Sequence, residues 1–77
     1  MTFRELDVVV LRRDLAARGL KAGDLGAVVN TYGDTALEVE FVTASGRTQA
    51  LVTLECSDVR AVASDDLVAV RSLNGAA

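Results

Sequence analysis

The sequence predicts a single small domain that is mainly β. A chain of 77 residues has room for only one core, because a chain of this size buries only about 60% of its unfolded surface. Its apolar residues are mostly Val, Leu and Ala, and its only aromatic residues are Phe3, Tyr32 and Phe41. β-Branched side chains favour strands, and the alternation of apolar and polar residues is typical of strands with one buried face.

The first two predicted strands are separated by a long loop. Residues 7–11 form a short valine-rich run, which indicates a strand covered on both faces. Polar residues and two glycines interrupt residues 12–23, so we expect a loop with one helical turn that Gly19 ends in a left-handed conformation. A second strand follows and ends at Tyr32, and its early Gly26 allows a sharp bend or the close approach of another backbone.

Three further strands follow in quick succession. Residues 36–42 alternate apolar and acidic side chains, so we expect the apolar ones inside and Glu38 and Glu40 outside. Residues 48–54 continue the alternation as a fourth strand, and residues 59–62 resume it as a short fifth one. The pattern breaks between these two strands, as it does at a single turn of 3₁₀ helix.

The pattern of residues 63–73 is compatible with either a helix or a strand. Leu67, Val70 and Leu73 have helical spacing, whereas Val68 and Val70 would also suit a strand. We therefore expect a docked C-terminal tail, either extended or helical, and disorder at residues 74–77.

Five short strands joined by a long loop, two hairpin turns and a 3₁₀ turn have the order of a small SH3-like five-stranded barrel. Closure into a barrel also removes the exposed edges that so apolar a sheet would otherwise present. We expect one such domain over residues 1–73. The alternative is an open antiparallel sheet packed on a C-terminal helix.

Four stretches of the sequence carry a resemblance to a known family: DVVVL (7–11), GLKAGDLGAVV (19–29), LEVEFV (37–42) and the TLE…SDVRAV stretch (53–62). They look like a family of small bacterial proteins known only as a domain of unknown function and expected to be SH3-like. This resemblance implies a bacterial or archaeal cytoplasmic protein that pairs with a toxin as an antitoxin or immunity partner. The second stretch also resembles the turn and strand shared by KOW modules and other SH3-like accessory subunits, which by itself implies a turn geometry and no particular ligand.

No residue pattern indicates catalysis. The chain has no histidine, which removes the commonest general base and the commonest transition-metal ligand. Its single cysteine, Cys56, has no second cysteine with which to form a zinc site, and we expect it to be structural. The turn at 23–26 lacks the spacing of a phosphate-binding loop and precedes a strand. We therefore predict that the chain is not an enzyme and has no catalytic, metal or cofactor site.

Cysteine content and hydropathy indicate the compartment. A lone cysteine cannot form an intramolecular disulfide, which favours the reducing cytoplasm for so small a domain. No stretch reaches the apolar length of a membrane span, and the first residues lack the pattern of a signal peptide. We expect a cytoplasmic protein with no membrane association.

Charge suggests where a partner binds. The net charge is −3, which opposes nucleic-acid binding over most of the surface. Basic residues concentrate in the first loop, at Arg12, Arg13, Arg18 and Lys21. The remaining candidates for partner contact are the acidic pair Glu38 and Glu40 and the aromatic Tyr32.

These residues support two hypotheses of function. The first is a non-catalytic protein-interaction module, of the antitoxin, immunity or accessory-subunit kind, that binds and modulates a partner enzyme. The second is a KOW-like nucleic-acid or ribosome-associated module, which would depend on the basic loop but lacks aromatic stacking platforms. The consecutive valines at 8–10 and Leu51, opposite the core face, also require cover from the tail or from a second subunit, so we expect a homodimer.

Overall fold

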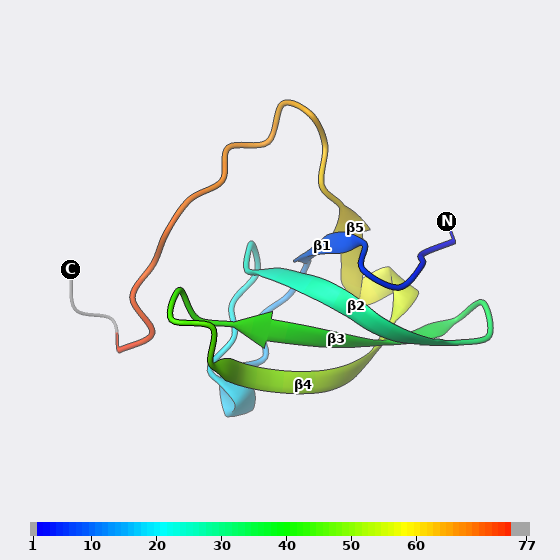
Figure 1. Cartoon of the computed structure of the whole chain (residues 1–77), viewed down its shortest axis with the longest axis horizontal. Helices are drawn as coiled ribbons and strands as arrows, with labels where there is room; N and C mark the ends of the chain where they lie inside the picture. Colours follow the sequence, from blue (N-terminus) through cyan, green and yellow to red (C-terminus); the bar gives the residue numbers. More distant parts are fainter. Residues whose placement is uncertain (1, 75–77) are drawn as a thin grey trace.

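The chain forms one antiparallel sheet that curls around a core on its inner face (Figure 1). The computed structural model describes residues 2–74. The strands are β1 (Val8–Leu11), β2 (Leu25–Tyr32), β3 (Ala36–Val42), β4 (Thr48–Glu55) and β5 (Val59–Ala61). The 3₁₀ turns are η1 (Ala16–Arg18) and η2 (Cys56–Asp58). The mainly β prediction is therefore confirmed, together with the 3₁₀ turn before the last strand.

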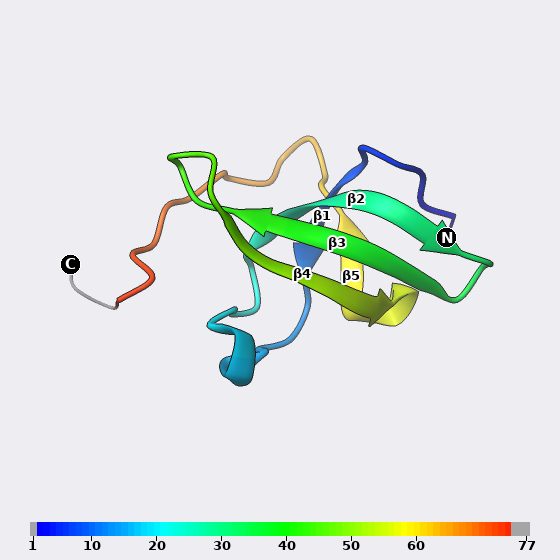
Figure 2. The same cartoon turned by 60° about the horizontal axis from the view of Figure 1, so that its bottom comes forward.

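The strand order is β4-β3-β2-β1-β5, so only β5 leaves the order of the chain, to pair with β1. Over residues 2–74 no pairing joins β5 to β4, and the expected closed barrel is therefore not confirmed. β5 has only three residues, and all three pair with β1. The sheet curls strongly all the same, and η2 bridges the gap between its two outer strands (Figure 2).

The inner face of the sheet carries the core, because the buried apolar residues recur at every second position of the strands. The expected inward set of β3 is confirmed, since Leu37, Val39 and Phe41 are at most 2% exposed. All five strands contribute to the core cluster, and segments outside the strands add Phe3 and Leu20. Its members are Phe3, Val9, Leu11, Leu20, Val28, Leu37, Val39, Phe41, Ala50, Leu54 and Val59.

Two bulges bend the strands around this core. In β2 the partners of Val28 and Asn30 are adjacent residues of β3, so Val29 is an extra residue in its strand. In β4 the partners of adjacent β3 residues skip Gln49 in the same way. An extra residue raises the local twist and turns a side chain away from its regular direction.

The tail after β5 has neither helix nor strand in the part of the chain described here, so the helical alternative is wrong. It runs as an irregular extended segment from β5 to the β3–β4 end of the sheet (Figure 1). It covers Val10, whose side chain belongs to the outer face and is 7% exposed. The expected cover on both faces of the first strand is therefore present at Val10 but not at Val8, which is exposed. The predicted disorder at 74–77 falls, from residue 75 onward, outside the described residues.

Candidate partner-binding surface

The loop between β1 and β2 is organised by short polar contacts. Leu15 and Leu20 form an isolated antiparallel bridge, which closes the turn η1 and places Leu20 in the core. Gly19 ends η1 at φ 69°, as expected for a left-handed cap. The carboxylate of Asp14 accepts the Ala22 N–H at 2.8 Å, and that of Asp24 accepts the Lys21 N–H at 2.9 Å. These bonds fix where the basic side chains of the loop start.

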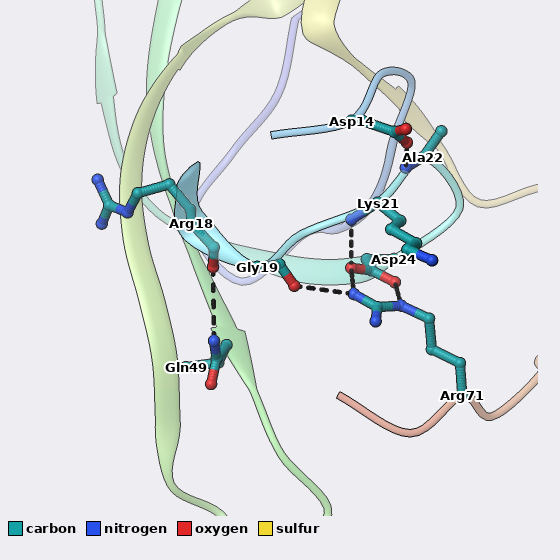
Figure 3. Close-up of polar contacts among 8 residues, drawn as sticks. All are labelled: Asp14, Arg18, Gly19, Lys21, Ala22, Asp24, Gln49 and Arg71. Carbon is teal, nitrogen blue, oxygen red and sulfur yellow. Dashed lines mark hydrogen bonds and ion pairs between the residues drawn. The ribbon is translucent and has the colours of Figure 1, made fainter. Parts of the chain in front are cut away.

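The structure places the four basic residues of this loop at separate points. Arg13 Nε donates to Asp58 Oδ1 at 2.8 Å and so ties the loop to η2. Arg18 donates to the Leu51 carbonyl of β4 at 3.0 Å. Lys21 lies beside Asp24 (Figure 3). The fourth, Arg12, is exposed, and its backbone N–H donates to the Asp58 carbonyl at 2.7 Å.

Asp58 is the polar centre of the junction between this loop and η2. Besides the guanidinium of Arg13, it accepts the Glu55 N–H at 3.0 Å. The hydrogen bond from Arg13 is the strongest influence on the pKa of Asp58. Together with the bond from Glu55 it outweighs partial burial and holds this pKa below its ordinary value.

Bonds from the same loop also protect the free edge of β4. Gln49, the extra residue of the β4 bulge, reaches the Arg18 carbonyl with its side-chain amide at 3.4 Å (Figure 3). With the bond from Arg18 to the Leu51 carbonyl, two contacts link η1 to β4. A covered edge is a poor template for another strand. Partner contact is therefore better sought on the face of the sheet than at this edge.

The outer face of the sheet collects the other candidate residues. Val8, Ala27, Glu40 and Leu51 stand opposite one another across β1, β2, β3 and β4. Val8 is 51% exposed and Leu51 is 47% exposed, which confirms that Leu51 lies opposite the core. Glu40 is half-buried within this row and accepts a hydrogen bond from Thr48 Oγ1 at 2.6 Å.

The row continues toward the β2–β3 turn. Glu38 pairs with Asn30, and Tyr32 lies two residues beyond Asn30 on the same face. Tyr32 is 45% exposed. The structure therefore brings Tyr32, Glu38 and Glu40 onto one surface, which sequence alternation indicated for the two glutamates. It separates them from the basic loop, which contacts the edge of β4.

Cys56 lies at the margin of the core. Its side chain is half-buried, packs against the core cluster and donates from Sγ to the Asp34 carbonyl at 3.5 Å. Within residues 2–74, no three His, Cys, Asp or Glu side chains gather closely enough to hold a metal ion. The part of the chain described here also has no helix long and apolar enough to cross a bilayer.

The tail is held at two points by ion pairs that the sequence analysis did not foresee. Near its start, Arg60 of β5 donates to both carboxylate oxygens of Asp66, at 2.8 and 3.1 Å. Near its end, Arg71 donates to both oxygens of Asp24, at 2.7 and 2.6 Å, and to the Gly19 carbonyl at 3.0 Å (Figure 3). Two-point contacts of this kind fix the direction of a guanidinium group.

Between these two anchors the apolar side chains of the tail face solvent. Leu67 is 96% exposed, Val68 74% and Val70 99%. Ordering an extended backbone costs about 1–2 kcal/mol per residue, and exposed ion pairs offset little of that cost. These three side chains, being exposed, therefore supply little of the apolar contact that usually holds such a segment in place.

Two hollows lie between the tail and the outer face. One of about 410 Å³ is lined by Leu25, Val42 and Leu73 among others, and contains the Asp24–Arg71 pair at its wall. The other, of about 250 Å³, lies between Val10 and the segment that begins at Leu67. The tail thus passes over apolar surface of the sheet but does not fill the hollows beneath it.

The two ion pairs act to lower the pKa values of Asp24 and Asp66. Partial burial acts to raise the pKa of Asp24, but the hydrogen bonds from Arg71 and from the Lys21 backbone outweigh it and leave this pKa below its ordinary value. The hydrogen bond from Arg60, followed by that from the Ala63 backbone, lowers the pKa of Asp66 from 3.8 to about 2. Both carboxylates are therefore charged at neutral pH.

These features define a small antiparallel β domain with a mixed apolar and acidic outer face. The chain belongs to the family described as Domain of unknown function (DUF4926), whose model matches residues 5–61. The match ends with the last residue of β5, so it includes every strand and leaves out the tail. No curated protein and no solved structure gives a significant match.

Proposed function

We propose that the chain is a non-catalytic protein-interaction module that binds a partner enzyme and modulates it, in the manner of an antitoxin, an immunity protein or an accessory subunit. In this proposal the fold is SH3-like, since a β4-β3-β2-β1-β5 order with a 3₁₀ turn before the last strand is the arrangement expected of that class. The protein acts in a bacterial cytoplasm.

The observation that carries the proposal is the composition of the outer face. Val8 and Leu51 are each about half exposed at opposite ends of one cross-strand row, and Tyr32 adds a third exposed apolar side chain. Such an apolar surface, with the carboxylates of Glu38 and Glu40 among its side chains, has the mixture found in protein interfaces. Tyrosine is among the residues that contribute most to binding energy at such interfaces.

The test is a tagged pull-down from the native cell at moderate salt, after nuclease treatment, with the wild-type chain and two variants. Leu51→Lys places a charge at the β4 end of the cross-strand row on the outer face. Ser57→Lys makes the same change of charge at an exposed position of η2 and serves as the matched control. Circular dichroism and thermal unfolding should show that both variants fold like the wild type.

We expect the wild type and Ser57→Lys to retain one stoichiometric protein whose enzymatic activity falls in the complex. Leu51→Lys should retain at least about tenfold less of it, because burying an unpaired charge is costly. Recovery of ribosomal proteins and nuclease-sensitive material alone would contradict the proposal. It would favour the nucleic-acid alternative, with Arg12, Arg13, Arg18 and Lys21 as its contacts.

A further inference from the structure

The tail and the sheet each carry apolar side chains that stay exposed within a single chain. On the sheet, Leu25 and Val42 are 37% and 55% exposed beside the larger hollow. On the tail, Leu67 and Val70 are almost completely exposed. The contact between tail and sheet consists mainly of the two ion pairs at its ends.

Charge defines what can occupy the outer face at this point. Arg60 stands at one end of the stripe that carries Val10 and Leu25, and Asp24 stands at the other. A matching segment must therefore be extended, with an acidic residue, about four apolar residues and then a basic residue. Residues 66–71, Asp-Leu-Val-Ala-Val-Arg, have this pattern, and a second copy of the chain offers the same segment.

The geometry of the connection permits that exchange. A single turn over 63–66, closed by the Asp66 N–H on the Ala63 carbonyl at 3.1 Å, joins β5 to the tail. The family match ends at residue 61, so the tail is an addition to a domain whose core is complete without it. Exchange of such a terminal segment between identical chains is a common route to dimers.

We propose that the tail binds in trans: two copies exchange residues 66–71, and Arg71 of each copy pairs with Asp24 of the other. The exchange preserves the contacts at the Asp24 end of the tail and brings the two outer faces together. Leu67, Val68 and Val70 then become covered by the second copy. The row formed by Val8, Ala27, Glu40 and Leu51 stays outside the exchanged segment.

A charge reversal split between two chains tests the exchange. Asp24→Arg and Arg71→Asp each place like charges together, whether the tail binds in its own chain or in another. A mixture of the two variants restores an opposite pair at both sites only when the tails are exchanged. Size-exclusion chromatography with light scattering should show the mixture at the mass of two chains, with a dimerisation constant at least about tenfold tighter than that of either variant alone.

Two controls keep the result interpretable. The double variant Asp24→Arg/Arg71→Asp should dimerise like the wild type and shows that the reversed pair is tolerated, since Asp24 also accepts the Lys21 N–H. In addition, a spin label at position 69 in a Cys56→Ser chain should broaden the amide signals of Leu25 and Val42 in an isotope-labelled, unmodified second chain. A monomeric mixture, or no broadening between chains at the highest accessible concentration, would overturn the exchange. Neither result bears on the partner enzyme proposed above, because no other protein is present.

Discussion

At the scale of a single residue, Gly26 of β2 leaves room for two core side chains of β3. It is buried on the inner face, where an added Cβ would lie 2.5 Å from Val39 Cγ1 and 2.9 Å from Phe41 Cε1. The sequence suggested that this glycine permits a bend or the approach of another backbone. The structure shows instead that two core side chains occupy the space above it.

Gly26→Ala should therefore overpack the core and lower the free energy of unfolding by about 1–3 kcal/mol. Urea unfolding followed by circular dichroism measures this loss. In a Val39→Ala background the cost should shrink, because the nearest clashing methyl group is absent, and a double-mutant cycle reads the difference. An unchanged unfolding midpoint for Gly26→Ala would show that the core has room that the structure does not contain.

The tail shows most clearly what a sequence pattern cannot settle at the scale of an element. Leu67, Val70 and Leu73 have helical spacing, yet a helix is stabilised by burying such a stripe, and Leu67 and Val70 are almost completely exposed in the tail. The strands differ because each has neighbours on both sides or a core beneath it. Alternation therefore predicted the inward residues of β3 correctly.

Two of the ion pairs, Asp24–Arg71 and Arg13–Asp58, were also beyond prediction, because each joins residues far apart in the chain. Asp24 and Arg71 are 47 positions apart. Arg13 and Asp58 are 45 apart. Sequence reasoning identified the basic loop as a feature, but only the fold shows that Arg13 and Arg18 make structural contacts with η2 and β4.

Attachment of the tail should depend on pH, with a sign set by its carboxylates. A lowered pKa in the folded state means that Asp66 contributes stability above its ordinary value of 3.8, and that this contribution is lost as the pH falls toward about 2. Asp24 acts in the same direction. The tail should therefore be bound at neutral pH and should detach in acid.

Two backbone amides report this titration directly. The Ala63 N–H donates to Asp66 at 2.7 Å and the Lys21 N–H donates to Asp24 at 2.9 Å. In NMR spectra recorded against pH, the Ala63 amide should titrate with a midpoint near 2, and Asp66→Asn should abolish that step. A midpoint near 3.8 for the wild type would mean that Asp66 is not engaged by Arg60.

At the scale of the whole molecule, the succession of strands could be anticipated because local signals specify the β2–β3 and β3–β4 turns, whereas the pairing of β5 with β1 and closure depend on contacts between distant strands. The 3₁₀ turn η2 carries the chain from β4 to β5 without pairing them. The outer face could be anticipated in part, since alternation places Glu38, Glu40 and Leu51 on it. Its cross-strand partners depend on register, which the bulges at Val29 and Gln49 alter.

The division between a complete core and an added tail leads to a prediction about the molecule as a whole. Every member of the core cluster lies between Phe3 and Val59, and the family match ends at residue 61. A chain shortened after Val62 should therefore still unfold in one cooperative transition. Its midpoint should fall by no more than about 5 °C, because the tail covers Val10 but supplies no core residue.

Differential scanning calorimetry of the shortened and full chains measures this difference, and light scattering on the same samples reads their mass. The shortened chain should be a monomer at concentrations at which the full chain dimerises, because it lacks Arg71. A full-length Leu67→Ser/Val70→Ser variant separates the effect of the ion pairs from the effect of the apolar side chains. It keeps both ion pairs and removes the exposed apolar side chains. Loss of the cooperative transition in the shortened chain would show that the tail is part of the folding unit, since a domain complete at β5 has to fold without it.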